Sequence, residues 1–291
     1  MKNKILYLLS LLAIVSCEKE IEFKGEGKDP VLVLNGIVEN DSIFKVYLER
    51  SFFFLSNEPT ENKFIKTGAT VKLTNLTSGE VFTMNQSTID NVYEFPFVTN
   101  PNTHFKIEVS HPDYENISAE MTTTSKVDLI DVDTSSYQKE SILNKKAVLK
   151  WKDPVGENYY MIRVFLTDTQ SGTNTSYHVG FECKDPVFED DSNIDNSQNY
   201  YQEIYFTDDL FEGKTKELEI NFNTYHANLP ENNPKYTYTL INMNKETYLY
   251  YVSIQKTMSV NSFFSEPVKV YSNINNGFGI FGSMSLSKIT K

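Results

Sequence analysis

The sequence predicts a mainly β protein made of two antiparallel β-sandwich domains, with one helix near the C-terminus. From Val31 onward, apolar and polar residues alternate with period two, and β-branched and aromatic residues are enriched. The alternating runs are short and are separated by clusters of Asn, Asp, Gly, Pro and Ser. The chain has 291 residues, of which 40% are hydrophobic, so it is long enough for two cores and too apolar to be disordered.

Residues 1–16 predict a lipoprotein signal peptide. Lys2 and Lys4 precede an apolar run of 11 residues, whereas a helix needs roughly 20 to span a bilayer. The run ends in Ile-Val-Ser followed by Cys17, which resembles the bacterial lipobox. In such signals the chain is cut before the Cys, which receives a diacylglycerol and a further acyl chain, and several chains anchor stably. We therefore expect a lipid anchor on Cys17; the other interpretation is an ordinary cleaved signal with an incidental Cys.

Residues 17–29 are expected to tether the folded part to the membrane. They begin with Glu18-Lys19-Glu20 after the Cys, which resembles the surface-export signal of Bacteroidota lipoproteins except for the central Lys. We therefore expect an outer-membrane protein exposed on the cell surface. The chain carries a formal charge of −12, and acid excess argues against nucleic acid, which needs a clustered Lys/Arg surface.

Residues 30–124 are predicted to form the first, immunoglobulin-like sandwich. Its strands are expected at residues 31–34, 43–48, 69–73 and 104–109. In the polar turn between the first two strands, Asp41-Ser42-Ile43 resembles the O-glycosylation acceptor of Bacteroidota envelope proteins, so Ser42 is a candidate modification site.

Residues 125–145 are polar and less regular, and we expect them to be a connector to the second domain at 146–291. That domain begins with a strand ending in Trp151, an Asp153-Pro154 turn and an aromatic strand, which resembles the B and C strands of fibronectin type III domains. Further strands are expected at residues 217–223, 236–241, 268–271 and 279–286.

The helix is predicted at about residues 244–260, where the spacing of apolar residues changes from period two. Tyr248, Tyr251 and Val252 share one face at helical spacing, and Asn244 can cap the N-terminus. Because the other side is apolar as well, we expect the helix to be largely buried. The doublet of Tyr250 and Tyr251, like those at 159–160 and 200–201, could offer a ring to a ligand, although in a strand one member of a doublet is usually core.

Gly277, Gly279 and Gly282 match the G-x-G-x-x-G pattern of dinucleotide-binding turns. A phosphate site needs a helix after the motif, but only 9 residues follow it and they alternate like a strand. We therefore expect these glycines to allow close strand packing and to adopt positive φ, at Gly277 in particular.

Two further clusters are candidates for ligands or partners. Asp191, Asn193 and Asp195 have the oxygen spacing of a calcium loop without its flanking helices or its twelfth-position Glu, so a solvated acidic loop is favoured over a weak calcium site. Phe52, Phe53 and Phe54 follow the second strand, and they cannot all face one core, so one is expected to contact a partner, a ligand or the other domain.

The sequence contains no recognisable catalytic motif. The four His lack metal-site spacing, no Ser has a nucleophile context, and Cys183 lies between acidic residues that disfavour its thiolate. Carboxylates are abundant, so a glycosidase pair stays open. We expect no cofactor.

Several segments together resemble one family, the Bacteroidota lipoproteins of domain-of-unknown-function family 4249. They are the lipobox with Cys17-Glu-Lys-Glu-Ile-Glu, Val33-Leu-Asn-Gly36, Asp153-Pro154 with Asn158-Tyr-Tyr160, Phe264-Ser-Glu-Pro267, and Tyr271-Ser-Asn-Ile-Asn-Asn-Gly-Phe-Gly-Ile-Phe-Gly282. The resemblance implies an outer-membrane lipoprotein that accompanies a TonB-dependent receptor, and it supplies no catalytic residues. We therefore expect a non-catalytic capture or gating partner of such a receptor in nutrient uptake. The alternatives are a surface glycan or peptide hydrolase and an envelope adhesin or structural lipoprotein.

Overall fold

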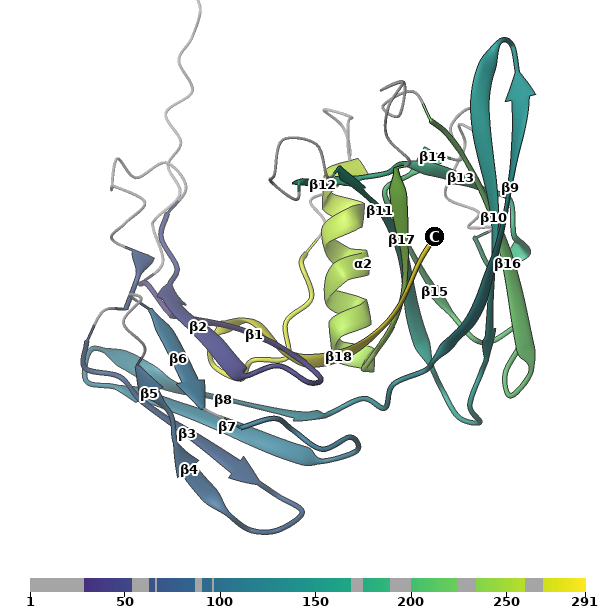
Figure 1. Cartoon of the computed structure of the whole chain (residues 1–291). Helices are drawn as coiled ribbons and strands as arrows, with labels where there is room; N and C mark the ends of the chain where they lie inside the picture. Colours follow the sequence, from purple (N-terminus) through teal and green to yellow (C-terminus); the bar gives the residue numbers. More distant parts are fainter. Residues whose placement is uncertain are drawn as a thin grey trace, which may run out of the picture.

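The protein is mainly β, with sandwich-like packing of antiparallel sheets and an α-helix near the C-terminus. The computed structural model describes residues 29–53, 63–65, 67–86, 91–95, 97–168, 175–188, 200–224, 234–259 and 269–291. Figure 1 shows two lobes joined by the long last strand, with the helix standing between them. No helix among the described residues is long and apolar enough to cross a membrane.

The largest sheet extends through both lobes. Its described strands are, in spatial order, β12 (Thr175–His178), β11 (Tyr159–Asp168), β17 (Lys235–Met243), β18 (Phe278–Thr290), β1 (Leu32–Glu39), β2 (Phe44–Arg50), β6 (Val92–Phe95) and β5 (Asn85–Gln86), with β15 (Glu203–Thr207) also paired to β11. The strand β18 lies between β17, to which it is antiparallel, and β1, to which it is parallel. The first and last described strands are therefore direct neighbours.

Two smaller sheets complete the sandwiches, one in each lobe. In the N-terminal lobe the order is β4 (Val81–Thr83), β3 (Thr70–Asn75), β7 (His104–His111) and β8 (Tyr114–Thr122). In the C-terminal lobe it is β14 (Tyr200–Tyr201), β13 (Phe181–Cys183), β16 (Thr215–Asn223), β10 (Ile142–Lys152) and β9 (Leu129–Lys139), with a 3-10 turn η3 (Pro186–Phe188) after β13. Strands with one buried face alternate as the sequence predicts; β1 buries every second residue from Leu32.

Each lobe has its own hydrophobic core. The N-terminal core is built by residues between Leu32 and Met121, together with Ile274 and Phe281 from the end of the chain. The C-terminal core is built by residues between Val127 and Leu240 and includes the fully buried Trp151. Strand β18 therefore supplies Phe281 to the first core and also packs against the second through Ile289.

The chain crosses from one lobe to the other behind the middle of β18. Ser283 Oγ accepts a hydrogen bond from the Thr124 N–H (3.1 Å), and Ser287 Oγ accepts one from the Leu129 N–H (2.9 Å). Both serines are buried, so they satisfy backbone groups of the crossing segment that are removed from water.

The helix α2 (Lys245–Ser259) begins where the sequence predicts, and Asn244 caps it. Asn244 Oδ1 accepts hydrogen bonds from the Thr247 N–H (3.3 Å) and from the Thr247 hydroxyl (2.6 Å). Thr247 is buried and most other helix side chains are mostly covered, so the expectation of a largely buried helix is confirmed for its middle, whereas Lys245, Gln255, Lys256 and Met258 near its ends are exposed. The helix packs on β18, β11 and β15 of the large sheet.

Two segments differ from the sequence prediction. The expected connector at 125–145 contains all of β9 and the start of β10, which form a long hairpin. The described part of the strand expected at 268–271 is irregular, because the Tyr271 N–H donates to Ser253 Oγ of α2 (2.8 Å) instead of to a neighbouring strand. Val268 lies outside the described residues.

Candidate functional site

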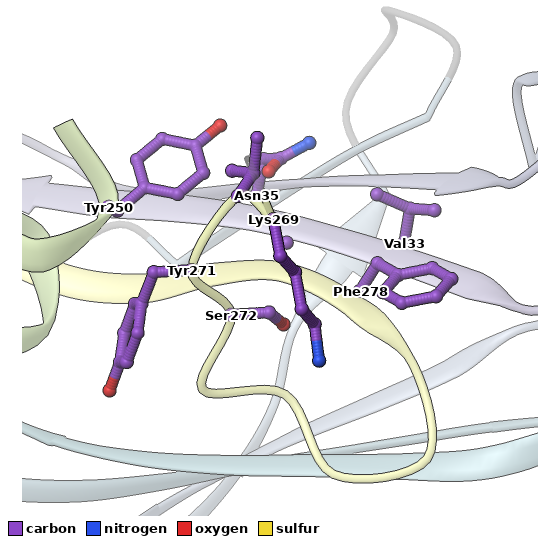
Figure 2. A pocket seen from close by; sticks show the side chains of 9 residues that line it. Val33, Asn35, Tyr250, Lys269, Tyr271, Ser272 and Phe278 are labelled. Carbon is purple, nitrogen blue, oxygen red and sulfur yellow. The ribbon is translucent and has the colours of Figure 1, made fainter. Parts of the chain in front are cut away.

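A pocket of about 350 Å³ lies where β1 and β18 run side by side next to α2. Its volume is at the lower end of the range for small-molecule sites. It is lined by Val33, Asn35, Tyr250, Lys269, Val270, Tyr271, Ser272, Phe278 and Gly279. Figure 2 shows Tyr250 at one end and Phe278 with Val33 at the other, with Lys269 and Ser272 between them.

The alternation of β1 places two of these side chains. Leu32 and Leu34 point into the N-terminal core and are fully buried, so Val33 and Asn35 point to the other face of the sheet. Phe278 is the register partner of Val33 across the parallel pair and is 52% exposed. An apolar strip therefore lies open on this face.

Gly279 makes the close approach of β18 to β1 possible. Its φ is +111°, a conformation that side-chain-bearing residues rarely adopt, and a Cβ there would overlap the carbonyl oxygen of Leu34. Gly277 has no positive φ, contrary to our expectation; the positive φ belongs to Asn276 (59°) and Gly279. Gly277 is nonetheless needed, since its Cβ would lie 2.6 Å from the Leu32 carbonyl oxygen.

Side-chain hydrogen bonds hold the irregular wall formed by residues 269–274. Besides the bond from Tyr271 to Ser253, the Asn273 amide donates to the Phe281 carbonyl (2.8 Å) and accepts from the Phe281 N–H (2.9 Å). The wall is thus fixed to the helix on one side and to β18 on the other. The pocket is largely preformed.

Tyrosine rings hold the helix that forms the pocket's end. Tyr248 packs on Tyr159 of β11 with ring centroids 5.0 Å apart, and Tyr251 stacks on Tyr205 of β15 at 5.7 Å. Tyr250, the neighbour of Tyr251, points instead to the pocket. The tyrosine doublet at 250–251 thus offers one ring to the site.

The chemistry of the lining is apolar and aromatic with a single charge. Burial raises the pKa of Tyr250, and burial together with nearby Glu246 raises the pKa of Tyr271, so both phenols stay protonated at neutral pH. Among the described lining residues, Lys269 is the only charged one. These described residues include no Asp, Glu, His or Cys that could act as nucleophile, general base or metal ligand.

Two buried carboxylates elsewhere bear on the question of a glycosidase pair. Asp153 accepts hydrogen bonds from the Tyr160 hydroxyl (2.5 Å) and the Gly213 N–H (2.6 Å), and Asp208 accepts from the Asn158 N–H (3.0 Å). Burial raises the pKa of Asp153, while its two hydrogen bonds act in the opposite direction. Both carboxylates are used to fix the turn after Trp151, so they are structural groups.

Cys183 is buried, and its thiol donates to the Glu219 carbonyl (3.3 Å). Burial raises its pKa to about 11, which disfavours the reactive thiolate. Among the described residues, no group of three or more His, Cys, Asp or Glu could hold a metal ion.

The residues singled out from the sequence are not brought together in this pocket. Ser42 is exposed in the turn between β1 and β2, where Asp41 has a φ of 64°, so its hydroxyl is accessible and glycosylation stays a prediction. Phe52 is 45% exposed and Phe53 is half-buried. The lipidation and calcium candidates lie outside the described residues, as does one of the three Phe residues: Cys17, Phe54, Asp191, Asn193 and Asp195.

The G-x-G-x-x-G segment does not form a nucleotide site, and β18 continues through its last two glycines. A Cβ on Gly282 would overlap Thr247 Oγ1, so this glycine lets α2 start directly on the strand.

The pocket itself was not predicted from the sequence. The alternation of β1 does single out Val33 and Asn35, but the pairing of β1 with the distant β18 has no local signal.

The fold and the pocket define a mainly β protein with a small pocket, lined by three aromatic rings, on one face of its largest sheet. The family model described as "Domain of unknown function (DUF4249)" matches residues 18–290, and the chain belongs to this family. No curated protein matches the chain.

Proposed function

We propose that this protein is a non-catalytic outer-membrane lipoprotein that captures a small solute for a TonB-dependent receptor. The observation that carries the proposal is the position of the pocket: one of its walls is β1, the first described strand after the tether. A lipid anchor at Cys17 would thus hold the pocket close to a membrane-embedded partner.

The length of the tether supports this arrangement. Val33 of the pocket comes sixteen positions after Cys17. A fully extended chain spans at most about 3.5 Å per residue, so the pocket would lie within roughly 55 Å of its anchor. A tether of this length would keep the protein within reach of a barrel in the same membrane.

The lining of the pocket supports capture over hydrolysis. Its nine described lining residues offer three aromatic rings, two valines and one lysine, and among them there is no pair of carboxylates for general acid–base work. Family membership supports the receptor, because the resemblance of the chain to Bacteroidota lipoproteins implies that partner.

The anchor is tested by replacing Cys17. With an alkynyl fatty acid in the growth medium, we expect label on the wild-type chain and none on Cys17→Ser, which should accumulate as an uncleaved or soluble form. Cys183→Ser is the matched control and should keep the label, since it is the other Cys of the chain. Undiminished label in Cys17→Ser would refute the lipid anchor.

The receptor is tested by purifying the affinity-tagged chain from native outer membrane in mild detergent. We expect one β-barrel receptor in stoichiometric amount. Recovery without a barrel, combined with release of sugars or peptides from envelope material, would replace the proposal with the hydrolase. Recovery with neither would favour the adhesin or structural protein.

A further inference from the structure

We infer that the pocket beside α2 binds a small amphipathic carboxylate, an acid that carries one aromatic or branched aliphatic group. This inference rests on the proposed function and names the class of solute that is captured. It follows from three features of the described lining: an apolar end, one free cation and a limited volume.

The apolar end is formed by Val33 and Phe278, with Val270 beside them. Phe278 is 52% exposed and Val270 is 40% exposed, so both leave hydrocarbon in contact with water. Covering such side chains with an apolar group is favourable, and an aromatic ring can pack against Phe278. The hydrophobic part of the solute therefore belongs at this end.

Lys269 determines which charge the solute carries, because its ammonium group attracts an anion. Among the described residues, Lys269 has no ion-pair or hydrogen-bond partner, whereas Glu49, the register partner of Val33 on β2, is paired with Lys63 (3.6 Å). In Figure 2 the Lys269 side chain runs past Ser272 between the two ends of the pocket. A carboxylate bound there would receive a charge-assisted hydrogen bond from the ammonium group.

The volume limits the size of this solute. A pocket of about 350 Å³ accommodates a single ring with a short acidic arm. Among the described lining residues, Lys269 is also the only charged group available to discriminate an acid from its neutral amide, because the others are uncharged at neutral pH.

The test compares phenylacetate with phenylacetamide, which have the same shape and differ in charge. Equilibrium dialysis uses the full chain in nanodiscs, with empty nanodiscs as the blank. We expect saturable binding of the acid and about fivefold weaker binding of the amide. Lys269→Gln should weaken acid binding about fivefold and change amide binding less than twofold.

The apolar end is tested in the same assay with Phe278→Ser, which should weaken binding of both probes about tenfold. The matched controls are Tyr177→Ser, a ring with the same 52% exposure on β12, and Lys288→Gln, an exposed lysine near the far end of β18. Neither control should change the binding of either probe.

The inference is overturned if neither probe binds saturably up to 10 mM, an order of magnitude above the weakest affinities considered for such sites. It is also overturned if the amide binds as tightly as the acid, or if Lys269→Gln and Lys288→Gln behave alike. Because the dialysis contains no receptor, these outcomes are independent of receptor co-purification, which alone tests the partner.

Discussion

Three glycines near the start of β18 permit close packing that any larger residue would prevent. Gly277, Gly279 and Gly282 each allow a backbone or side-chain contact that a Cβ would block, against Leu32, Leu34 and Thr247 respectively. A sequence pattern that looks like a phosphate loop is thus explained by packing. The distances from an added Cβ to its neighbours support the packing role, because α2 and β1 both approach β18 more closely than a methyl group permits.

Gly282→Ala should lower the free energy of unfolding by about 1–3 kcal/mol, the usual cost of forcing extra volume into a packed site. The added methyl group would displace Thr247 and break the bonds by which Asn244 and Thr247 accept the Ser283 N–H (3.1 Å each). Urea denaturation followed by circular dichroism measures the change. Gly79→Asn is the control: that glycine has φ +79°, which Asn tolerates, and open space around it. Equal losses for the two variants would contradict the packing role of Gly282.

Cys183 should be inert to thiol reagents while the protein is folded. Its pKa is raised to about 11 by burial, so about one thiol in a thousand is ionised at pH 8 even where the reagent can reach it. With 5,5′-dithiobis(2-nitrobenzoate) at pH 8, we expect no reaction in buffer and one equivalent in 8 M urea when Cys17 is acylated. Rapid reaction of the folded chain would show that the thiol is accessible.

At the scale of elements, β18 determines how the two lobes are joined. Its alternate residues Ser283, Ser285 and Ser287 are buried and face the segment that crosses between the lobes. Apolar residues in place of Ser283 and Ser287 would leave the Thr124 and Leu129 N–H groups without these acceptors. The hydrogen bonds therefore explain why a strand that lies inside the molecule carries these two small polar residues.

Ser287→Ala should lower the free energy of unfolding by about 1–3 kcal/mol, because the buried Leu129 N–H loses its acceptor. Ser285→Ala is a matched control one pleat away. Ser285 Oγ is buried without a hydrogen-bond partner among the described residues, so its removal should be neutral or slightly stabilising. Denaturant titration of both variants is decisive, since equal effects would contradict the assignment of the Ser287 hydrogen bond.

Much of the element pattern is predictable from the sequence, because it depends on local periodicity. Alternation locates β1, β2, β3 and β7, and Asn244 marks the start of the helix. The parallel pairing of β1 with β18 is not predictable in this way, since about 240 residues separate the partners and either strand could pair with many others. The pocket depends on that pairing. Strand β9 was also hidden, because its exposed, polar residues resemble a loop.

At the scale of the whole molecule, the tether enters the N-terminal lobe beside an exposed aromatic residue. The Ser51 N–H donates to the Val31 carbonyl (2.8 Å), and the Val31 N–H donates to Ser51 Oγ (3.0 Å). These bonds fix Phe52 next to the point where the chain arrives from Cys17. If the anchor lies in the membrane, Phe52 lies on the part of the surface that a receptor in the same membrane meets first.

Phe52→Ser should therefore reduce co-purification of the receptor severalfold without lowering the melting temperature. Aromatic residues are frequent anchors of protein interfaces, and Phe52 is already 45% exposed, so its removal costs the isolated fold little. Phe53→Ser should behave differently, because Phe53 is half-buried and has contacts within the protein, so its melting temperature should fall. Tyr177→Ser, in the other lobe, should change neither the recovery of the receptor nor the melting temperature. Unchanged receptor recovery with Phe52→Ser would exclude this surface as the contact, and a lowered melting temperature would assign Phe52 to the fold of the N-terminal lobe.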